Sequence, residues 1–396
     1  MRERTHWIAV AAALLPGVIG GALHGKMPTA LPLLQGEFAL SLIAAGWLVS
    51  MFSLVGLAGA VFLGLISDRV GALRLCLFGV GTQIAGGLLG AAAPGAATLI
   101  ASRVIEGVGF VAVTVSAPLL IAAASAAGER GLAIGLWGTH MPAGSAVAVL
   151  VSPLAIAAFG WRGLWLAVAV VAVAVGALLL AQSREYREAG SGARRSLADV
   201  KASLAQPMPW LLGSVFALYT TQWVVVMVWL PTYLMETRAM THADAAMLTA
   251  AYIVANAFGN VLGSWFTHRN VLRGRVIRNV FVLTTLCFLG MFAPGLGDGP
   301  RFALVLLFSF ITGNIPPSVV SGGVRYARSV AEVGILQGLI VQLSNLGTFA
   351  GPPIAAAVVT WAGAWDAVRW VLIAAGLAGI AVALVILRHE RANAGA

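Results

Sequence analysis

Twelve apolar stretches, nearly all of them long enough to cross a bilayer, constrain this chain more than any other feature. A transmembrane helix needs about 20 consecutive apolar residues, and backbone polar groups in lipid must be satisfied within the segment itself. The predicted spans are 7–32, 41–66, 72–93, 97–124, 131–156, 162–182, 209–235, 243–267, 279–294, 302–324, 333–358 and 366–388. The pattern therefore predicts an all-α membrane protein of twelve transmembrane helices.

The composition agrees with this interpretation. Of the 396 residues, 60% are hydrophobic and 10% are charged, whereas a soluble domain carries about 25% charged residues. Too few charges remain to cover a surface that faces water, so most of the surface must face lipid. The two cysteines, Cys76 and Cys287, have neither a disulfide pattern nor metal-site spacing.

The basic residues gather on one predicted side of the membrane. That side holds eighteen of the 24 Lys and Arg residues, namely Arg2, Arg4, Arg69, Arg74, Arg130, Arg184, Arg187, Arg194, Arg195, Lys201, Arg269, Arg273, Arg275, Arg278, Arg325, Arg328, Arg388 and Arg391. The other side holds Arg162, Arg238, Arg301 and Arg369. The positive-inside rule then places both termini inside the cell. The net charge of +10 thus reflects topology and contact with anionic lipid headgroups, not a nucleic-acid partner.

A polar connection at 183–208 lies at the middle of the helix count. It divides the chain into two predicted six-helix bundles, 1–182 and 209–396, joined by a cytoplasmic linker. Leu31-Pro32 and Leu230-Pro231 recur at an offset of 199 residues near the ends of the first and seventh spans. This recurrence favours a duplicated unit with parallel repeats, as in many secondary transporters.

The loop after the second span contains Gly64-Leu-Ile-Ser-Asp68-Arg69-Val-Gly71-Ala-Leu-Arg74. It resembles the G-x-L-a-D-r-x-G-r-r signature of the major facilitator superfamily. An Asp in such a loop can cap a helix and pair with Arg in one conformation, and the glycines permit a tight turn. The resemblance implies that Gly64, Asp68, Arg69 and Gly71 form a conformational switch. The alternative is an ordinary basic cytoplasmic loop.

Two further segments bear on this resemblance. The run from Arg103 to Gly109 is similar to the superfamily's R-x-x-q-G-x-g pattern, with Glu106 in place of the usual amide. The run from Gly138 to Gly144 only partly matches the Gly-Pro-x-x-Gly-Gly run of antiporters. Residues 137–142 and 160–162 loosely resemble the cyanate-type anion transporters, which favours an anionic substrate.

Three charged residues lie well inside predicted helices: Lys26, Arg103 and Glu106. Such residues are costly in lipid and are usually functional. Arg103 and Glu106 are spaced i, i+3, so we expect them to pair. Lys26 is then left without an acidic partner, which favours binding of an anion near Lys26 and Arg103. The alternative is that Lys26 snorkels to the outer headgroups.

Two histidines accompany these charges. His24 lies near a stripe of Gly17, Gly21 and Gly25, which suits close helix packing, so we expect a packed, hydrogen-bonded side chain. His140 is predicted in the middle of a helix, where it shuttles protons, pairs with Glu106 or simply packs.

The second half of the chain contributes neutral polar groups instead of charges. The candidates for contact with substrate are Tyr219, Gln222, Trp223, Asn256, Asn314 and Gln342. Amides can bind an anion or a neutral solute, but each taken alone is equally suited to tying helices together.

These features predict a secondary transporter that works by alternating access and imports a small anion together with protons. Glu106 and His140 are the expected proton-coupling residues, and a monomer would suffice. A bacterial-type inner membrane is the expected location. The alternatives are a proton-driven exporter of drugs or metabolites and a non-transporting sensor. An enzyme is not expected, because H-E-x-x-H and G-x-S-x-G motifs are absent, and the sequence predicts no metal or cofactor.

Overall fold

The computed structural model describes residues 4–59, 70–186, 201, 204–269, 271–293, 295–327 and 330–394. All regular secondary structure within these ranges is helical. Three of the predicted switch residues, Gly64, Asp68 and Arg69, lie outside the described residues, as do 187–200 and 202–203 of the predicted linker.

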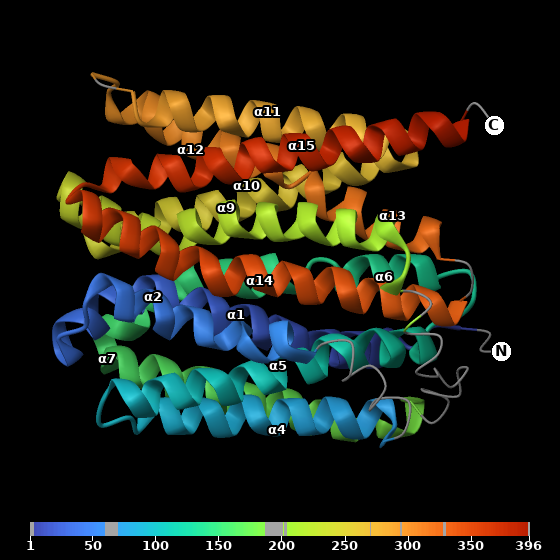
Figure 1. Cartoon of the computed structure of the whole chain (residues 1–396). Helices are drawn as coiled ribbons and strands as arrows, with labels where there is room; N and C mark the ends of the chain where they lie inside the picture. The colour runs from blue at the N-terminus through green and yellow to red at the C-terminus, as the bar shows by residue number, and fades with distance from the viewer. Residues whose placement is uncertain are drawn as a thin grey trace. The chain divides into compact units, whose positions relative to one another are not determined.

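The chain divides into two compact units, each described by itself. The first comprises Met1–Leu40, Met51–Arg195 and Met240–Ala250. Its described elements are α1 (Trp7–Phe38), η1 (Met51–Ser53), α4 (Ala72–Ala91), α5 (Ala96–Ala124), α6 (Arg130–Trp137), α7 (His140–Ala181) and η2 (Ser183–Tyr186). Within this unit α1 packs on α5 and α7, and α4 packs on the same two helices (Figure 1).

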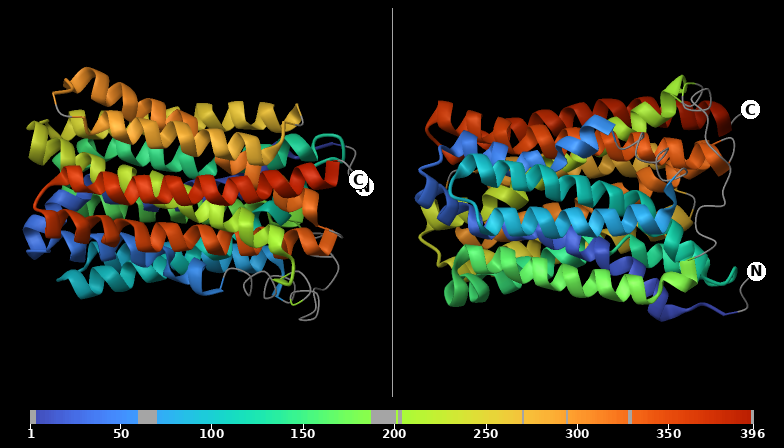
Figure 2. Two further views of the ribbon diagram at one scale, coloured as in Figure 1. Left: turned by 45° about the horizontal axis from the view of Figure 1, so that its top comes forward. Right: turned by 90° about the horizontal axis from the view of Figure 1, so that it is seen from below.

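The second unit comprises Ser41–Ser50, Ser196–Ala239 and Ala251–Ala396. Its elements are α2 (Leu42–Ser50), α9 (Pro207–Arg238), most of α10 (His242–His268), α11 (Arg273–Met291), α12 (Asp298–Thr312), α13 (Ile315–Tyr326), α14 (Val330–Ala362), η3 (Trp365–Ala367) and α15 (Val368–Ala394). Here α9 packs on α14 and α15, and α11 packs on α15 and α12. The helices of each unit run side by side in both views of Figure 2.

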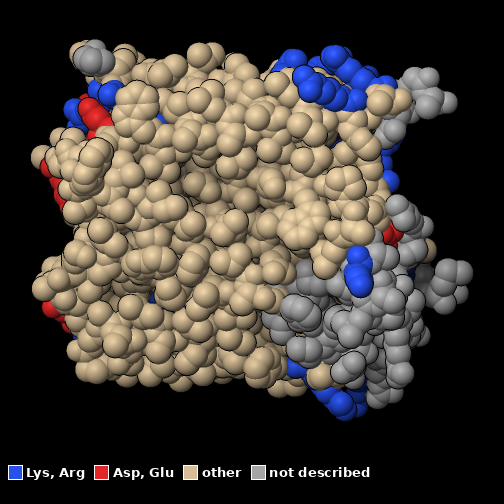
Figure 3. Space-filling view, in the orientation of Figure 1, with Lys and Arg blue, Asp and Glu red and all other residues tan. Residues whose placement is uncertain are grey.

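The predicted helical membrane fold is confirmed. Eleven helices in the described residues are long and apolar enough to cross a membrane. The longest, α7, covers two predicted spans, 131–156 and 162–182, because its 42 residues continue across a bend at Gly160, where φ is 70° and ψ is 175°. On the face drawn in Figure 3, the side chains of Lys, Arg, Asp and Glu lie near helix ends, and other residues cover the helix middles.

The expected close packing of the glycine stripe is also present, and its partner is α7. A Cβ atom at Gly21 would lie 2.7 Å from the carbonyl oxygen of Met141, and one at Gly25 would lie 2.5 Å from that of Ser145. Both are closer than real Cβ atoms approach. The stripe thus lets α1 and α7 touch backbone to backbone, and Ser145 Oγ donates a 2.9 Å hydrogen bond to the Gly21 carbonyl.

Parallel features recur near the sequence offset of 199. Helices α1 and α9 both contain 32 residues. Each ends at a left-handed alanine, Ala39 with φ 48° and Ala239 with φ 50°. Near these ends, the indole of Trp161 donates to Glu37 at 2.5 Å, and that of Trp365 donates to Glu236 at 2.9 Å. Each unit thus anchors the end of its first long helix with a tryptophan–glutamate hydrogen bond.

Candidate functional site

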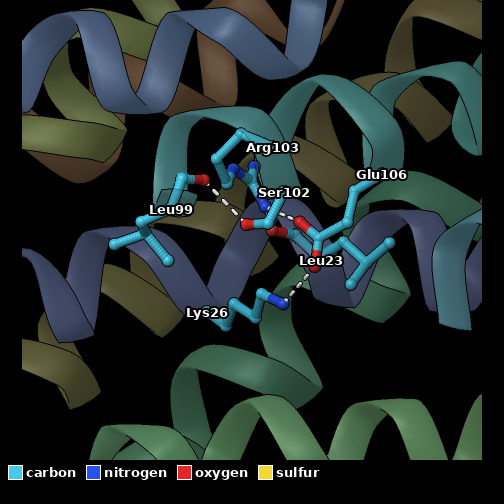
Figure 4. Close-up of polar contacts among 6 residues, drawn as sticks. All are labelled: Leu23, Lys26, Leu99, Ser102, Arg103 and Glu106. Carbon is cyan, nitrogen blue, oxygen red and sulfur yellow. Dashed lines mark hydrogen bonds and ion pairs between the residues drawn. The ribbon is translucent and has the colours of Figure 1, made fainter. Parts of the chain in front are cut away.

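A cluster of three charged side chains lies inside the first unit, where α1 crosses α5. Lys26 comes from α1, and Arg103 and Glu106 come from α5; all three are fully buried. Lys26 Nζ lies 2.7 Å from Glu106 Oε1, and Arg103 Nη1 forms an ion pair with Glu106 Oε2. One carboxylate therefore serves two cations (Figure 4).

The arrangement confirms one expectation and corrects another. Arg103 and Glu106 pair as predicted from their spacing on one helix. The expectation that Lys26 lacks an acidic partner is wrong, because packing of α1 on α5 brings it to the second oxygen of Glu106. Lys26 does not snorkel, since its side chain is fully buried and its ammonium is bound inside the unit.

Arg103 has hydrogen-bonding capacity beyond these contacts. Its Nη1 also donates to the Leu23 carbonyl at 3.0 Å, but no described residue accepts from Nε or Nη2. Those two nitrogens form one planar edge of the guanidinium, which matches a pair of oxygens on a carboxylate or a similar oxyanion. The cluster carries two positive charges and one negative charge, so an anion would complete its neutralisation.

Aromatic rings cover the two cations. Lys26 Nζ lies 4.2 Å from the ring centroid of Trp165 on α7, and Arg103 Cζ lies 4.6 Å from that of Phe52 in η1. Ring faces attract cations, by about 2 kcal/mol when both are desolvated. The sequence did not indicate Trp165 and Phe52, because an aromatic residue in an apolar helix looks the same in the sequence whether or not a charged side chain packs on its ring.

The two histidines differ from expectation. His24 packs against Phe52, with ring centroids 5.7 Å apart, but neither of its ring nitrogens has a hydrogen-bond partner among the described residues. His140 is the first residue of α7 instead of lying mid-helix, because α6 ends at Trp137. Its Nδ1 lies 2.6 Å from the Trp137 carbonyl, so this nitrogen is engaged by the backbone of the preceding turn and not by Glu106.

The polar candidates of the second unit are mostly engaged as ties between helices. Tyr219 donates to Asn256 at 3.4 Å, and Asn256 donates to the Ser309 carbonyl at 3.0 Å. Gln222 donates to the Leu372 carbonyl at 2.8 Å. The structure thus brings Tyr219 and Asn256 together.

Three buried polar atoms in these candidates have no partner among the described residues. They are Gln222 Oε1, Trp223 Nε1 and Asn314 Oδ1. Trp223 stacks on Tyr252 with centroids 5.8 Å apart, Asn314 caps the start of α13, and Gln342 is half-buried on α14.

Gly71 is the one predicted switch residue that the structure describes. It precedes α4 with φ 92° and ψ 141°. This backbone conformation lies in a region that is essentially restricted to glycine. The start of α4 therefore requires glycine at position 71.

The helical fold and the buried charge cluster define a polytopic membrane protein with an ionisable centre in its interior. A family model described as the Major Facilitator Superfamily matches residues 17–331, and the chain belongs to this superfamily.

Its curated relatives differ in substrate and direction. The multidrug efflux pump LfrA of Mycolicibacterium smegmatis is 32% identical over 161 residues, which are 40% of this chain and 32% of that protein. The galactose-proton symporter of Escherichia coli is 29% identical over 164 residues, covering 41% of this chain and 34% of that protein. The match thus spans about a third of the length of these two relatives.

A third relative aligns over much more of the chain. The probable nitrate/nitrite transporter NarK2 of Mycobacterium tuberculosis is 26% identical over 328 residues, which are 80% of each protein. Among solved structures, a bacterial homologue of the human lysosomal transporter Spinster, inward-facing and unoccupied, superimposes with a TM-score of 0.83. It covers 98% of both chains at 13% identity, a likeness that concerns the fold alone.

Proposed function

We propose that this protein is a secondary transporter that imports a small anion together with protons by alternating access. The observation that carries the proposal is the sharing of Glu106 between Lys26 and Arg103 in the interior of the first unit. Lys26 and Arg103 attract the anion, and Glu106 takes the proton.

The coupling follows from charge balance. While Glu106 is ionised, it occupies both cations, and an arriving anion must compete with it. Protonation removes that negative charge, so Lys26 and Arg103 become available to the anion. Each ligand thus favours binding of the other, which is positive cooperativity between two sites, with a favourable (negative) coupling free energy. Release of the proton restores the internal ion pairs and expels the anion.

The choice of an anion rests on two further observations. The Nε and Nη2 edge of Arg103 has no acceptor among the described residues, and it suits a ligand with two adjacent oxygens. The relative that aligns with 80% of this chain is named as a nitrate/nitrite transporter. Nitrate and nitrite are therefore the first substrates to test.

The remaining site residues take supporting parts in this proposal. Tyr219, Gln222, Trp223, Asn256, Asn314 and Gln342 form polar, uncharged walls that hold the solute without fixing its charge. Gly64, Asp68, Arg69 and Gly71 act as the conformational switch, and His140 exchanges protons with the inner side.

The proposed organisation follows the sequence pattern. Residues 1–182 and 209–396 form two six-helix bundles joined by a cytoplasmic linker at 183–208, with both termini inside. One chain holds both bundles, so a monomer suffices. The proposed location is a bacterial inner membrane.

Uptake into proteoliposomes tests the proposal. Purified protein is reconstituted with an alkaline interior, and accumulation of labelled nitrate or nitrite is measured against its gradient. We expect accumulation that stops when a protonophore removes the pH gradient. Glu106→Gln should still exchange labelled for unlabelled anion but should no longer concentrate it. Concentration of the anion by Glu106→Gln would show that the coupling role is wrong.

A proton-driven exporter is the second candidate. Its support is the 32% identity to a multidrug efflux pump over 161 residues. In an exporter, the proton and the solute exchange at Glu106 instead of binding together. Cells that overproduce the protein would then accumulate less of a fluorescent cationic dye than cells that produce Glu106→Gln, and proteoliposomes would show no anion uptake.

A further inference from the structure

Two buried polar side chains beside the charge cluster have no assigned role. His24 on α1 is 4% exposed, and Gln83 on α4 is 1% exposed. Both ring nitrogens of His24 and both polar atoms of the Gln83 amide lack a hydrogen-bond partner among the described residues. Burial of such groups without partners is unfavourable, and ordered water is the usual partner in a polar interior site.

One face of α1 places these side chains in a row. Gly17, Gly20 and His24 are spaced i, i+3 and i+7, so they lie on the same side of the helix. A Cβ atom at Gly17 would lie 3.0 Å from Cδ2 of His140, and one at Gly20 would lie 3.6 Å from Nε2 of Gln83. Along α1, the order is therefore His140, Gln83 and His24, over about 10 Å of helix.

Aromatic rings lie along the same face of α1, where a Cβ atom at Gly20 would clash with Cδ2 of Phe110. The centroid of His24 lies 5.7 Å from that of Phe52, Phe52 lies 5.2 Å from Phe110, and Phe110 lies 6.5 Å from His140. The two phenylalanines thus form an apolar wall from one histidine to the other. Water held by the polar groups would be kept in single file beside this wall.

The row reaches Glu106 at one end. Gln83 precedes Gly86 by one turn of α4, and a Cβ atom at Gly86 would lie 2.7 Å from Cγ of Glu106. Arg103 covers the ring of Phe52 that His24 also contacts. The opposite end is His140 at the start of α7, whose side chain is only partly buried.

We propose that His24 and Gln83 hold ordered waters that carry protons between Glu106 and His140. The inference rests on the proposed protonation of Glu106 and adds the route by which the proton arrives. His24 contacts Phe52 of η1, and the guanidinium of Arg103 of α5 lies over the ring of the same Phe52.

His24 takes part as a neutral ring, because the cation Arg103 lies over the ring of Phe52 that His24 also contacts, and this cation disfavours a second positive charge nearby. A neutral imidazole accepts a hydrogen bond at one nitrogen and donates at the other. A water that carries the extra proton from the His140 side gives it to the free nitrogen, while the N–H proton passes to the next water and from there to Glu106. The ring ends as its other tautomer, with its charge unchanged. Gln83 orients the adjacent water without gaining or losing a proton.

The test follows protonation of Glu106 directly and needs no transported solute. The full chain is reconstituted in liposomes, and its carboxyl infrared band is recorded after a rapid pH jump; the band of Glu106 is the one missing from Glu106→Gln. His24→Phe keeps an aromatic ring against Phe52, and Gln83→Met keeps the length of the side chain. We expect both to slow protonation of Glu106 by about tenfold or more. His24→Gln, whose amide binds water but cannot relay a proton through its own atoms, should slow it as well.

Ser116→Ala serves as the matched control, because it removes a buried hydroxyl of α5 that donates to the Ala112 and Val113 carbonyls. Its rate should equal that of the unmodified protein. Equal rates in His24→Phe, Gln83→Met and the unmodified protein would overturn the water path and leave the proton site in place. If no Glu106 band titrates in the unmodified protein, the proposed proton site fails, and the water path fails with it.

Discussion

Lys26 and Glu106, eighty residues apart in the sequence, form a 2.7 Å ion pair in the interior of the first unit. Arg103 occupies the other oxygen of the same carboxylate. Because a charge buried in lipid or protein is costly unless it is paired, this geometry makes each member of the cluster depend on the other two. It also leaves one positive charge in excess, which is the basis of the proposed anion binding.

Stability should respond unequally to removal of the three charges. Glu106→Gln leaves two buried cations without a counter-charge, and we expect a loss of about 3–5 kcal/mol. Lys26→Met leaves the neutral Arg103–Glu106 pair and should cost less. Unfolding of purified protein in detergent measures both values. Equal losses of unfolding free energy in the two variants would mean that Lys26 does not depend on the shared carboxylate of Glu106. The double variant Lys26→Met/Glu106→Gln would measure the coupling energy between these two residues.

Arg103→Lys tests whether the shape of the guanidinium matters beyond its charge. Lysine keeps the positive charge but lacks a planar edge with two donors. We expect the concentration of nitrate needed for half-maximal uptake to rise about tenfold, which corresponds to the loss of about 1.4 kcal/mol of binding. The matched control is Arg162→Lys, since Arg162 pairs with Glu37 at an exposed position. A surface pair of this kind contributes about 0–1 kcal/mol, and uptake should not change.

The contact between α1 and α7 should not tolerate a single added methyl group at Gly21. Its Cβ would lie 2.7 Å and 2.9 Å from two backbone oxygens of α7, which cannot move away independently. Overpacking of this kind costs about 1–3 kcal/mol. Gly135→Ala in α6 meets no atom within 4 Å and should stabilise that helix by about 0.5–1 kcal/mol. Thermal unfolding of the two variants would then shift in opposite directions.

The left-handed alanines that end α1 and α9 predict stabilising substitutions. An L residue in this conformation costs roughly 1–2 kcal/mol, and glycine avoids that cost. Ala39 and Ala239 are exposed, so their methyl groups contribute little packing. Ala39→Gly and Ala239→Gly should each raise the free energy of unfolding by about 0.5–1 kcal/mol. As a control, Ala167→Gly, at an exposed helical position of α7, should lower the free energy of unfolding. If neither Ala39→Gly nor Ala239→Gly raises the free energy of unfolding, the prediction is wrong.

Local pattern accounts for what could be predicted. Stretches of about 20 apolar residues identify membrane helices, and the structure adds only their ends and the bend at Gly160. The Arg103–Glu106 pair was predictable because both residues lie on one turn of one helix. The glycine stripe indicated close packing but not its partner, since small residues mark an interface without identifying the opposite helix.

Contacts between distant segments could not be predicted in the same way. No local rule joins Lys26 to Glu106, places Trp165 beneath the ammonium, or leaves His24 without a hydrogen-bond partner among the described residues, because each depends on how α1, α5 and α7 pack. The sequence by itself determined a helical membrane protein with three buried charges in its first half. Only the tertiary structure decided that the two cations, Lys26 and Arg103, share the carboxylate of Glu106. Helix packing sets the distances between these residues, whereas a hydropathy profile scores each segment without reference to the others.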